Sequence, residues 1–225
     1  MIRALYIILA VVVLAACETD TYETGDGKYS YLRAEFAMVK TSDSKKIVSA
    51  ETDDSEILAI SPAFTCEWAE KGDTTYRALI YINKVENAKT NILSVAQVPV
   101  LFPHSHEEVD TVGYDPLDVE SAWLSHNGRF ANLRLAIKTG TPDDPGLRQT
   151  IALAADNITD LGNGNTRYYV TLRHNQNGVP EYYTSNLYVS IPTDKLGVGD
   201  EMSITVNTYK GKREFLFVIP SLPVY

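Results

Sequence analysis

Two short stretches of the 225-residue chain carry residue types that could do chemistry. In the first, "HSHEE", His104, His106 and Glu108 would lie on one face if the segment were extended. Two imidazoles and a carboxylate suit zinc, but a complete site needs a further ligand from elsewhere in the chain. Prolines and acidic residues surround the segment, as is typical of an exposed connection. A metal site that serves a hydrolase is therefore one hypothesis, and a polar loop is the other.

The second stretch, "TLRHNQNGVPEYYT", places His174, Glu181 and Tyr182 close together in the sequence. At its centre, Asn177-Gly178 is typical of a two-residue hairpin turn, in which both residues adopt positive φ. That register would set His174 opposite Glu181 at the ends of two paired strands. The pattern favours a structural hairpin over an active site. It leaves His174, Glu181 and Tyr182 as candidates for contact with a partner.

The sequence offers no further support for catalysis. It contains no G-x-S-x-G, HExxH or matched S-x-x-K motif. Neighbouring carboxylates such as Asp53 and Asp54 point apart on an extended chain, so they make a poor acid–base pair. We therefore expect a protein that is not an enzyme, with no catalytic residue and no cofactor. The tyrosines offer an alternative, an exposed aromatic platform for glycans, although tyrosine is also a common half-buried strand residue.

The charge balance is acidic, with 29 Asp and Glu residues against 20 Lys and Arg residues and a net charge of −9. Such a chain repels phosphate backbones, which argues against nucleic acid as a partner.

The N-terminus predicts export and lipidation. Residues 1–16 combine an arginine with a thirteen-residue uncharged run, too short for a comfortable membrane span and typical of a signal peptide. The run ends in "LAAC", which resembles a bacterial lipobox with Cys17 as the residue that carries the lipid. Acyl chains on Cys17 would attach the protein to a membrane. Residues 17–28 are acidic and glycine-containing, which indicates a tether.

The remaining chain alternates apolar and polar residues with period two, which predicts an all-β protein. Residues 29–102 contain about five such segments and suggest a small barrel or sandwich. Residues 103–116, rich in proline and acids, indicate a linker between domains. Six to seven short strands separated by turn residues follow in residues 117–225 and predict an antiparallel β-sandwich.

Several segments together resemble the NigD-like family of bacterial lipoproteins. They are "TGDGKYSYLRAEF", "DTTYRALIYINK", "DPLDVESAWLSHNGRFANLRLAIKTG", "YYVTLRHNQNGVPEYYTSNLYVSIP" and "ITVNTYKG". The resemblance implies an N-terminal OB-like domain, a C-terminal β-sandwich domain and attachment to the outer membrane, on a face that the sequence does not select. The family name, taken from a bacteriocin gene cluster, hints at bacteriocin immunity. The resemblance to this family assigns no catalytic residues.

The same resemblance suggests O-glycosylation at Asp-Thr sites. Thr74 and Thr111 match that pattern, and Thr111 is favoured because it lies in the predicted linker. The sequence thus predicts a non-catalytic envelope lipoprotein that binds an unknown protein or, alternatively, a glycan.

Overall fold

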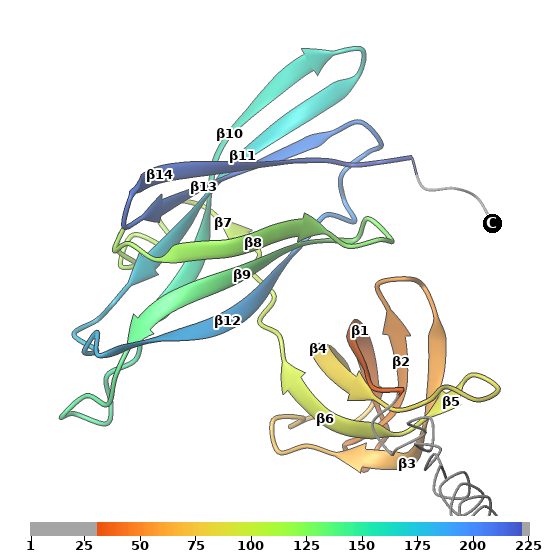
Figure 1. Cartoon of the computed structure of the whole chain (residues 1–225). Coiled ribbons are helices and arrows are strands. Elements are labelled where there is room, and N and C mark those ends of the chain that lie inside the picture. Colours follow the sequence, from red (N-terminus) through yellow and green to blue (C-terminus); the bar gives the residue numbers. More distant parts are fainter. Residues whose placement is uncertain (1–30, 222–225) are drawn as a thin grey trace, which may run out of the picture. The chain divides into compact units, whose positions relative to one another are not determined.

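The computed structural model describes residues 31–221, which are built almost entirely from β-strands and turns (Figure 1). Within this range no helix has the length and apolar character needed to cross a membrane. The predicted signal peptide, Cys17 and the acidic tether lie outside the described residues. The all-β class predicted from the alternating pattern is confirmed.

Fourteen strands account for the described part of the chain. The first six form one sheet: β1 (Arg33–Thr41), β2 (Lys46–Thr52), β3 (Ile57–Thr65), β4 (Thr75–Ile82), β5 (Lys89–Thr90) and β6 (Ile92–Gln97). The other eight form two further sheets: β7 (Pro103–His104), β8 (Asp118–Leu124), β9 (Phe130–Thr139), β10 (Thr150–Gly162), β11 (Asn165–Asn175), β12 (Tyr183–Pro192), β13 (Glu201–Thr208) and β14 (Gly211–Val218).

The first sheet closes on itself as a small barrel. Its order is β5-β3-β2-β1-β4-β6. Only Asn91 separates β5 from β6, so these two strands are halves of one segment. That segment pairs in parallel with β3 through β5 and antiparallel with β4 through β6, which joins the two ends of the sheet (Figure 1). The result is a five-stranded Greek-key barrel of the OB type, as the resemblance implied.

Alternation along the strands fills the barrel. In β4, Ala78, Ile80 and Ile82 point inward and are buried, with Tyr76 packed against them, in line with the period-two alternation of the sequence. In β1 the inward residues are Ala37 and Val39. Between Tyr76 and Ala78 of β4 lies Arg77, a buried cation on the outward face of that strand.

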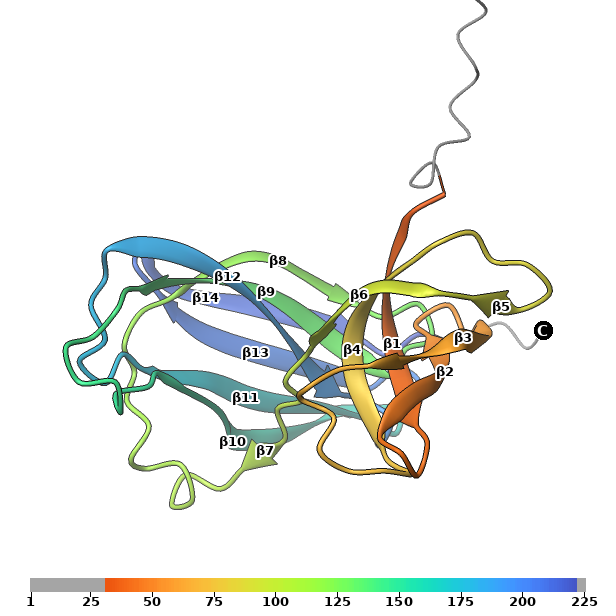
Figure 2. The same ribbon diagram turned by 90° about the horizontal axis from the view of Figure 1, so that it is seen from below.

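The C-terminal strands form a β-sandwich of two sheets, ordered β14-β13-β11-β10-β7 and β12-β9-β8. Figure 2 shows β13, β11 and β10 side by side in the larger sheet. The predicted β-sandwich is confirmed, and most of its strand pairs are antiparallel. Two pairs are parallel: β11 with β13, from Arg167–Glu201 to Leu172–Val206, and β7 with β10. The intervening strand β12 runs back through the other sheet, so β13 re-enters the first sheet in the direction of β11.

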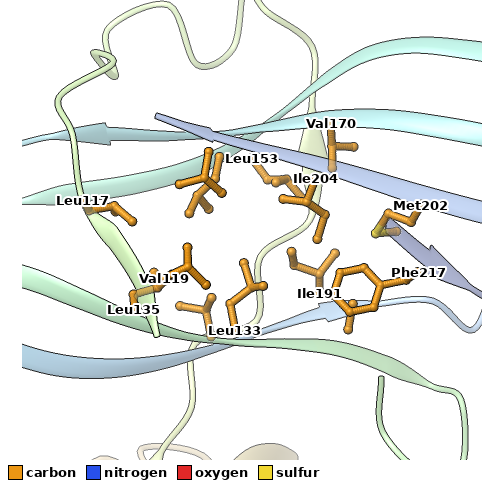
Figure 3. Close-up of a cluster of buried hydrophobic side chains, with 14 of the residues drawn as sticks. Leu117, Val119, Leu133, Leu135, Leu153, Val170, Ile191, Met202, Ile204 and Phe217 are labelled. Carbon is orange, nitrogen blue, oxygen red and sulfur yellow. The ribbon is translucent and has the colours of Figure 1, made fainter. Parts of the chain in front are cut away.

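The sandwich core lies between its two sheets. Figure 3 shows Leu133 and Leu135 of β9 facing Leu153 of β10 and Ile204 of β13. These four side chains have no exposed surface. Each buried leucine or isoleucine contributes about 1.5–3 kcal/mol through removal of apolar surface from water, so this cluster supplies much of the stability of the sandwich.

The segment between barrel and sandwich is bound to both sandwich sheets. Leu101 N donates to Ser190 O, and Ser190 N donates to Pro99 O, each at 2.9 Å, on β12 of the smaller sheet. Pro103 and His104 then form β7 beside β10 of the larger sheet. Further along the predicted linker, Val109 and Val112 are buried. Residues 103–116 are therefore packed against the sandwich along much of their length.

Candidate functional site

The structure does not gather the predicted metal ligands. The segment turns at Ser105, whose N–H and hydroxyl both donate to Glu108 Oε2, at 2.8 and 2.9 Å. His104 Nδ1 lies 3.8 Å from Glu108 Oε1, whereas His106 Nε2 lies 3.0 Å from Asp156 Oδ1. Among residues 31–221 no group of three or more His, Cys, Asp or Glu side chains is arranged to hold a metal ion. The expected shared face is wrong because the segment is not extended.

The stretch "TLRHNQNGVPEYYT" is not a hairpin. Strand β11 pairs with β10 and β13, and β12 pairs with β9 in the other sheet, so the predicted pairing of His174 with Glu181 is wrong. Asn177 and Gly178 do adopt positive φ, at 52° and 73°. The turn therefore forms as expected, but it carries the chain from one sheet of the sandwich to the other.

His174 is a buried core residue with 1% of its surface exposed. Its Nε2 atom lies 3.0 Å from Gln149 Oε1, while Nδ1 is buried without a hydrogen-bond partner. Burial lowers the pKa of His174, although the nearby backbone and carboxylate of Asp115 oppose this shift. The side chain is inaccessible, so a role for His174 in direct contact with a partner is excluded.

A protonated His174 is expected to destabilise the fold. Because the folded-state pKa is lowered below the unfolded value of about 6.5, the unfolded chain binds more protons between these two values. Stability is therefore fully present above about pH 6.5 and falls as pH decreases through that window. His174→Gln should flatten this dependence, measured as urea midpoints at pH 7.5, 6.5 and 5.5. A wild-type slope in His174→Gln would contradict this assignment.

Glu181 and Tyr182 remain accessible. Glu181 Oε2 lies 3.4 Å from Lys138 Nζ, which also sits 4.2 Å from the centre of the Tyr209 ring. Tyr182 is 79% exposed. A Cβ placed on Gly140 would lie 2.8 Å from Tyr182 Cδ2, so the glycine lets this ring pack closely against the backbone. Of the three predicted contact residues, these two offer surface to a partner.

The two predicted glycosylation sites differ in their surroundings. Thr111 is exposed, while Thr74 is half-buried and its hydroxyl donates to Gly72 O at 2.9 Å. Exposure favours Thr111, and modification of either residue stays a prediction.

Sequence reasoning missed a buried polar cluster that joins the barrel to the sandwich. Both belong to one compact unit that begins at Arg33. Arg77 Nη1 and Nη2 donate to the two carboxylate oxygens of Asp53 at 2.6 and 2.7 Å. From the sandwich, Asn132 Oδ1 and Ser190 Oγ each accept from Arg77 at 3.2 Å, and Phe130 places its ring 4.2 Å from the guanidinium carbon. The sequence feature that could have indicated this cluster is Arg77, a single arginine within the mainly apolar strand β4.

A groove of about 730 Å³ opens beside the β10–β11 hairpin of the sandwich. Its apolar lining includes Ile158 and Tyr168 from that hairpin and Met202 from β13. Charged side chains at its border are Asp156, Asp194 and Lys195. This size and mainly apolar lining are typical of ligand and peptide sites.

Comparison with known proteins agrees with the fold. The family model for the NigD-like C-terminal beta sandwich domain matches residues 100–218, more than half of the chain. A NigD-like immunity protein from Bacteroides caccae is similar at a TM-score of 0.59 and 24% identity, over 84% of this chain and 97% of that one.

A second solved structure, a protein of unknown function (DUF1344) from Bacteroides vulgatus, is similar at a TM-score of 0.62 and 15% identity. That similarity covers 84% of this chain and 92% of the other. No curated protein sequence matches the chain. The match over residues 100–218 shows that the chain belongs to the NigD-like family.

Proposed function

We propose that this protein acts by binding rather than by catalysis, with a bacteriocin-like toxin or another envelope protein as its partner. The observation that supports the proposal most directly is the apolar groove of about 730 Å³ beside the β10–β11 hairpin. It provides recessed apolar surface next to charged groups, the combination that specific binding requires. The similar structure from Bacteroides caccae is itself described as an immunity protein, which agrees with an immunity-like role.

The proposal places the protein on the outer membrane through lipid on Cys17. A lipid anchor would hold it where an incoming toxin or a neighbouring envelope protein is encountered. Because the chain carries a net charge of −9, attraction to an anionic membrane surface contributes little and the acyl chains would provide the attachment.

Partner capture in the bacterium that makes the protein tests this function. The lipidated protein is cross-linked in intact cells, and the captured partner is identified by mass spectrometry and then purified for direct binding. We expect one envelope protein or toxin to bind the purified chain. Deletion of the gene should increase sensitivity to at least one bacteriocin in a panel. Unchanged sensitivity across the panel would contradict the immunity role, and absence of any specific partner would contradict the binding role.

Glycan binding is a second candidate, favoured by Tyr182. The ring is 79% exposed and rests against Gly140, which leaves an accessible aromatic surface of the kind that sugars stack on. If this alternative holds, the purified chain is retained on a polysaccharide gel and Tyr182→Ala is not. Equal mobility of both proteins on every gel would argue against it.

A further inference from the structure

The outer face of the larger sandwich sheet, which points away from the core, has a polar hollow. Leu172 of β11 and Val206 of β13 belong to the core. Their neighbours Thr171 and Thr205 therefore point outward, because successive side chains of a strand lie on opposite faces of the sheet. The two threonines are partners in the parallel β11–β13 pairing, and both line a hollow of about 410 Å³.

The lining of the hollow offers polar groups that are not used elsewhere. Its five residues are Tyr114, Thr171, Thr205, Asn207 and Lys212. Asn207 and Lys212 are partners in the β13–β14 pairing, which sets both on the outer face with Thr205. Within residues 31–221, the Thr205 hydroxyl and the Lys212 ammonium make no hydrogen bond or ion pair, so both are open to a ligand.

Two carboxylates next to the hollow are held by other side chains. Glu214 is the partner of Thr205 across β13–β14, but it accepts a hydrogen bond from the hydroxyl of Ser203. Asp156 accepts from the Thr171 hydroxyl at 2.7 Å, and its other oxygen lies 3.0 Å from His106 Nε2. Neither carboxylate lines the hollow, so its lining is free of negative charge although the chain carries a net charge of −9.

Tyr114 forms an aromatic wall that is fixed in place. Its ring is 53% exposed, and the guanidinium carbon of the buried Arg173 lies 4.3 Å from the ring centre. Its backbone oxygen accepts from Asn207 Nδ2 at 2.6 Å. Because Arg173 covers one face of the ring and does not line the hollow, the other face is the accessible one. A ring held in this way loses little freedom when a ligand binds.

An aromatic ring beside open polar groups selects the class of ligand. The C–H face of a pyranose ring packs against an aromatic ring, and the sugar hydroxyls both donate and accept hydrogen bonds. A protein partner would need a larger apolar centre than the ring of Tyr114 supplies. A polyanion would be repelled by the net charge of −9. A neutral sugar meets neither obstacle.

We propose that the hollow over β11, β13 and β14 is a binding site for a neutral oligosaccharide. One pyranose ring stacks on the accessible face of Tyr114, and its hydroxyls exchange hydrogen bonds with Thr205 and Lys212. The hollow shares no residue with the apolar groove, so the two sites are distinct. The inference goes beyond the proposed binding of a protein partner and does not depend on it, and it gives glycan binding a site other than Tyr182.

The test is electrophoresis of the full-length protein, in a non-ionic detergent, through native gels that each contain one polysaccharide. The neutral polysaccharides are amylopectin, galactomannan and a mixed-linkage glucan, and polygalacturonate is the polyanion. We expect at least one neutral polysaccharide to slow the protein. Its affinity for an oligosaccharide of that polysaccharide, measured by titration calorimetry, should be the same at low and at high salt, because no ion pair forms. Retardation by none of the neutral polysaccharides, or by polygalacturonate alone, would overturn the proposal.

Variants of tyrosine locate the stacked ring. Tyr114→Ala should weaken binding of the oligosaccharide at least about tenfold, because the stacking surface is lost. Tyr114→Phe keeps the ring and should bind as wild type. Tyr183→Ala is the matched control, since Tyr183 is 58% exposed on β12 in the smaller sheet. An equal effect of Tyr114→Ala and Tyr183→Ala would overturn the assignment, and loss of binding in Tyr182→Ala alone would move the sugar site to Tyr182.

Variants of the polar groups separate recognition from loss of folding. Thr205→Val removes an unpaired hydroxyl, so it should leave the urea midpoint unchanged and weaken sugar binding about three- to tenfold. Lys212→Gln should also weaken binding, whereas Lys46→Gln removes the same charge from the barrel and should bind as wild type. Wild-type affinity in both Thr205→Val and Lys212→Gln would show that the site is wrong. The function proposed for a protein partner would still stand, because capture in cells tests it separately.

Discussion

Replacing Asp53 with alanine is expected to lower the free energy of unfolding by about 3–5 kcal/mol, the usual cost of leaving one member of a buried ion pair uncompensated. The Arg77 side chain has 0% exposure and that of Asp53 15%, so water cannot replace the lost carboxylate. The two hydrogen bonds to Asn132 and Ser190, each at 3.2 Å, remain but do not neutralise the guanidinium. Urea unfolding followed by tryptophan fluorescence measures the change.

Two comparisons isolate the cause of this loss. Asp54→Ala removes a neighbouring carboxylate whose partner, His126, is exposed, and should cost less than about 1 kcal/mol. Asp53→Ala combined with Arg77→Met removes both charges and should recover most of the stability, because an apolar side chain of similar volume tolerates the buried position. If the double variant is as unstable as the single one, the uncompensated charge is not the cause.

Cys17→Ala should abolish attachment to the membrane completely. The thiol is the proposed site of the lipid, and without acyl chains an acidic chain has little affinity for anionic bilayers. Metabolic labelling with a palmitate analogue should fall to background in the variant. Fractionation should move the protein from the membrane pellet to the soluble fraction.

The other cysteine provides the control for this experiment. Cys66 is half-buried beside the barrel core, and burial raises the pKa of its thiol, which makes it a weak nucleophile. Cys66→Ala should keep the full label. Label retained by Cys17→Ala would refute the anchor.

Local sequence patterns predicted the strands well, but not which strands pair. Two Asn-Gly turns make the difference clear. Asn163-Gly164 joins β10 and β11 directly, since these strands end at Gly162 and begin again at Asn165, and the result is a hairpin. Asn177 and Gly178 have similar positive φ values, 52° and 73° against 55° and 82° in the first turn, but seven residues separate β11 from β12. Those additional residues, Pro180 among them, let β12 cross to the other sheet, where Val189 and Ile191 are buried.

Contacts between residues far apart in the sequence could not be predicted from local sequence patterns either. Asp53 was considered only beside its neighbour Asp54, although its carboxylate lies 2.6 Å from the guanidinium of Arg77, 24 positions along the chain. The groove likewise combines residues 102, 158 and 202, whose proximity depends on how β10, β11 and β13 are ordered in the sheet. Alternation along one strand contains no information on that order.

The bonds made by Val98–His104 affect how the sandwich could be separated from the rest of the chain. A fragment that begins at residue 117 would lose the pairing of Leu101 with Ser190 and all of β7. It would expose a strand edge in each sheet, and open edges promote aggregation. The transferable unit therefore begins no later than Pro99, one residue before the segment that matches the family model, which starts at residue 100. Transfer of this sandwich to another protein would therefore have to include the segment Pro99–His104.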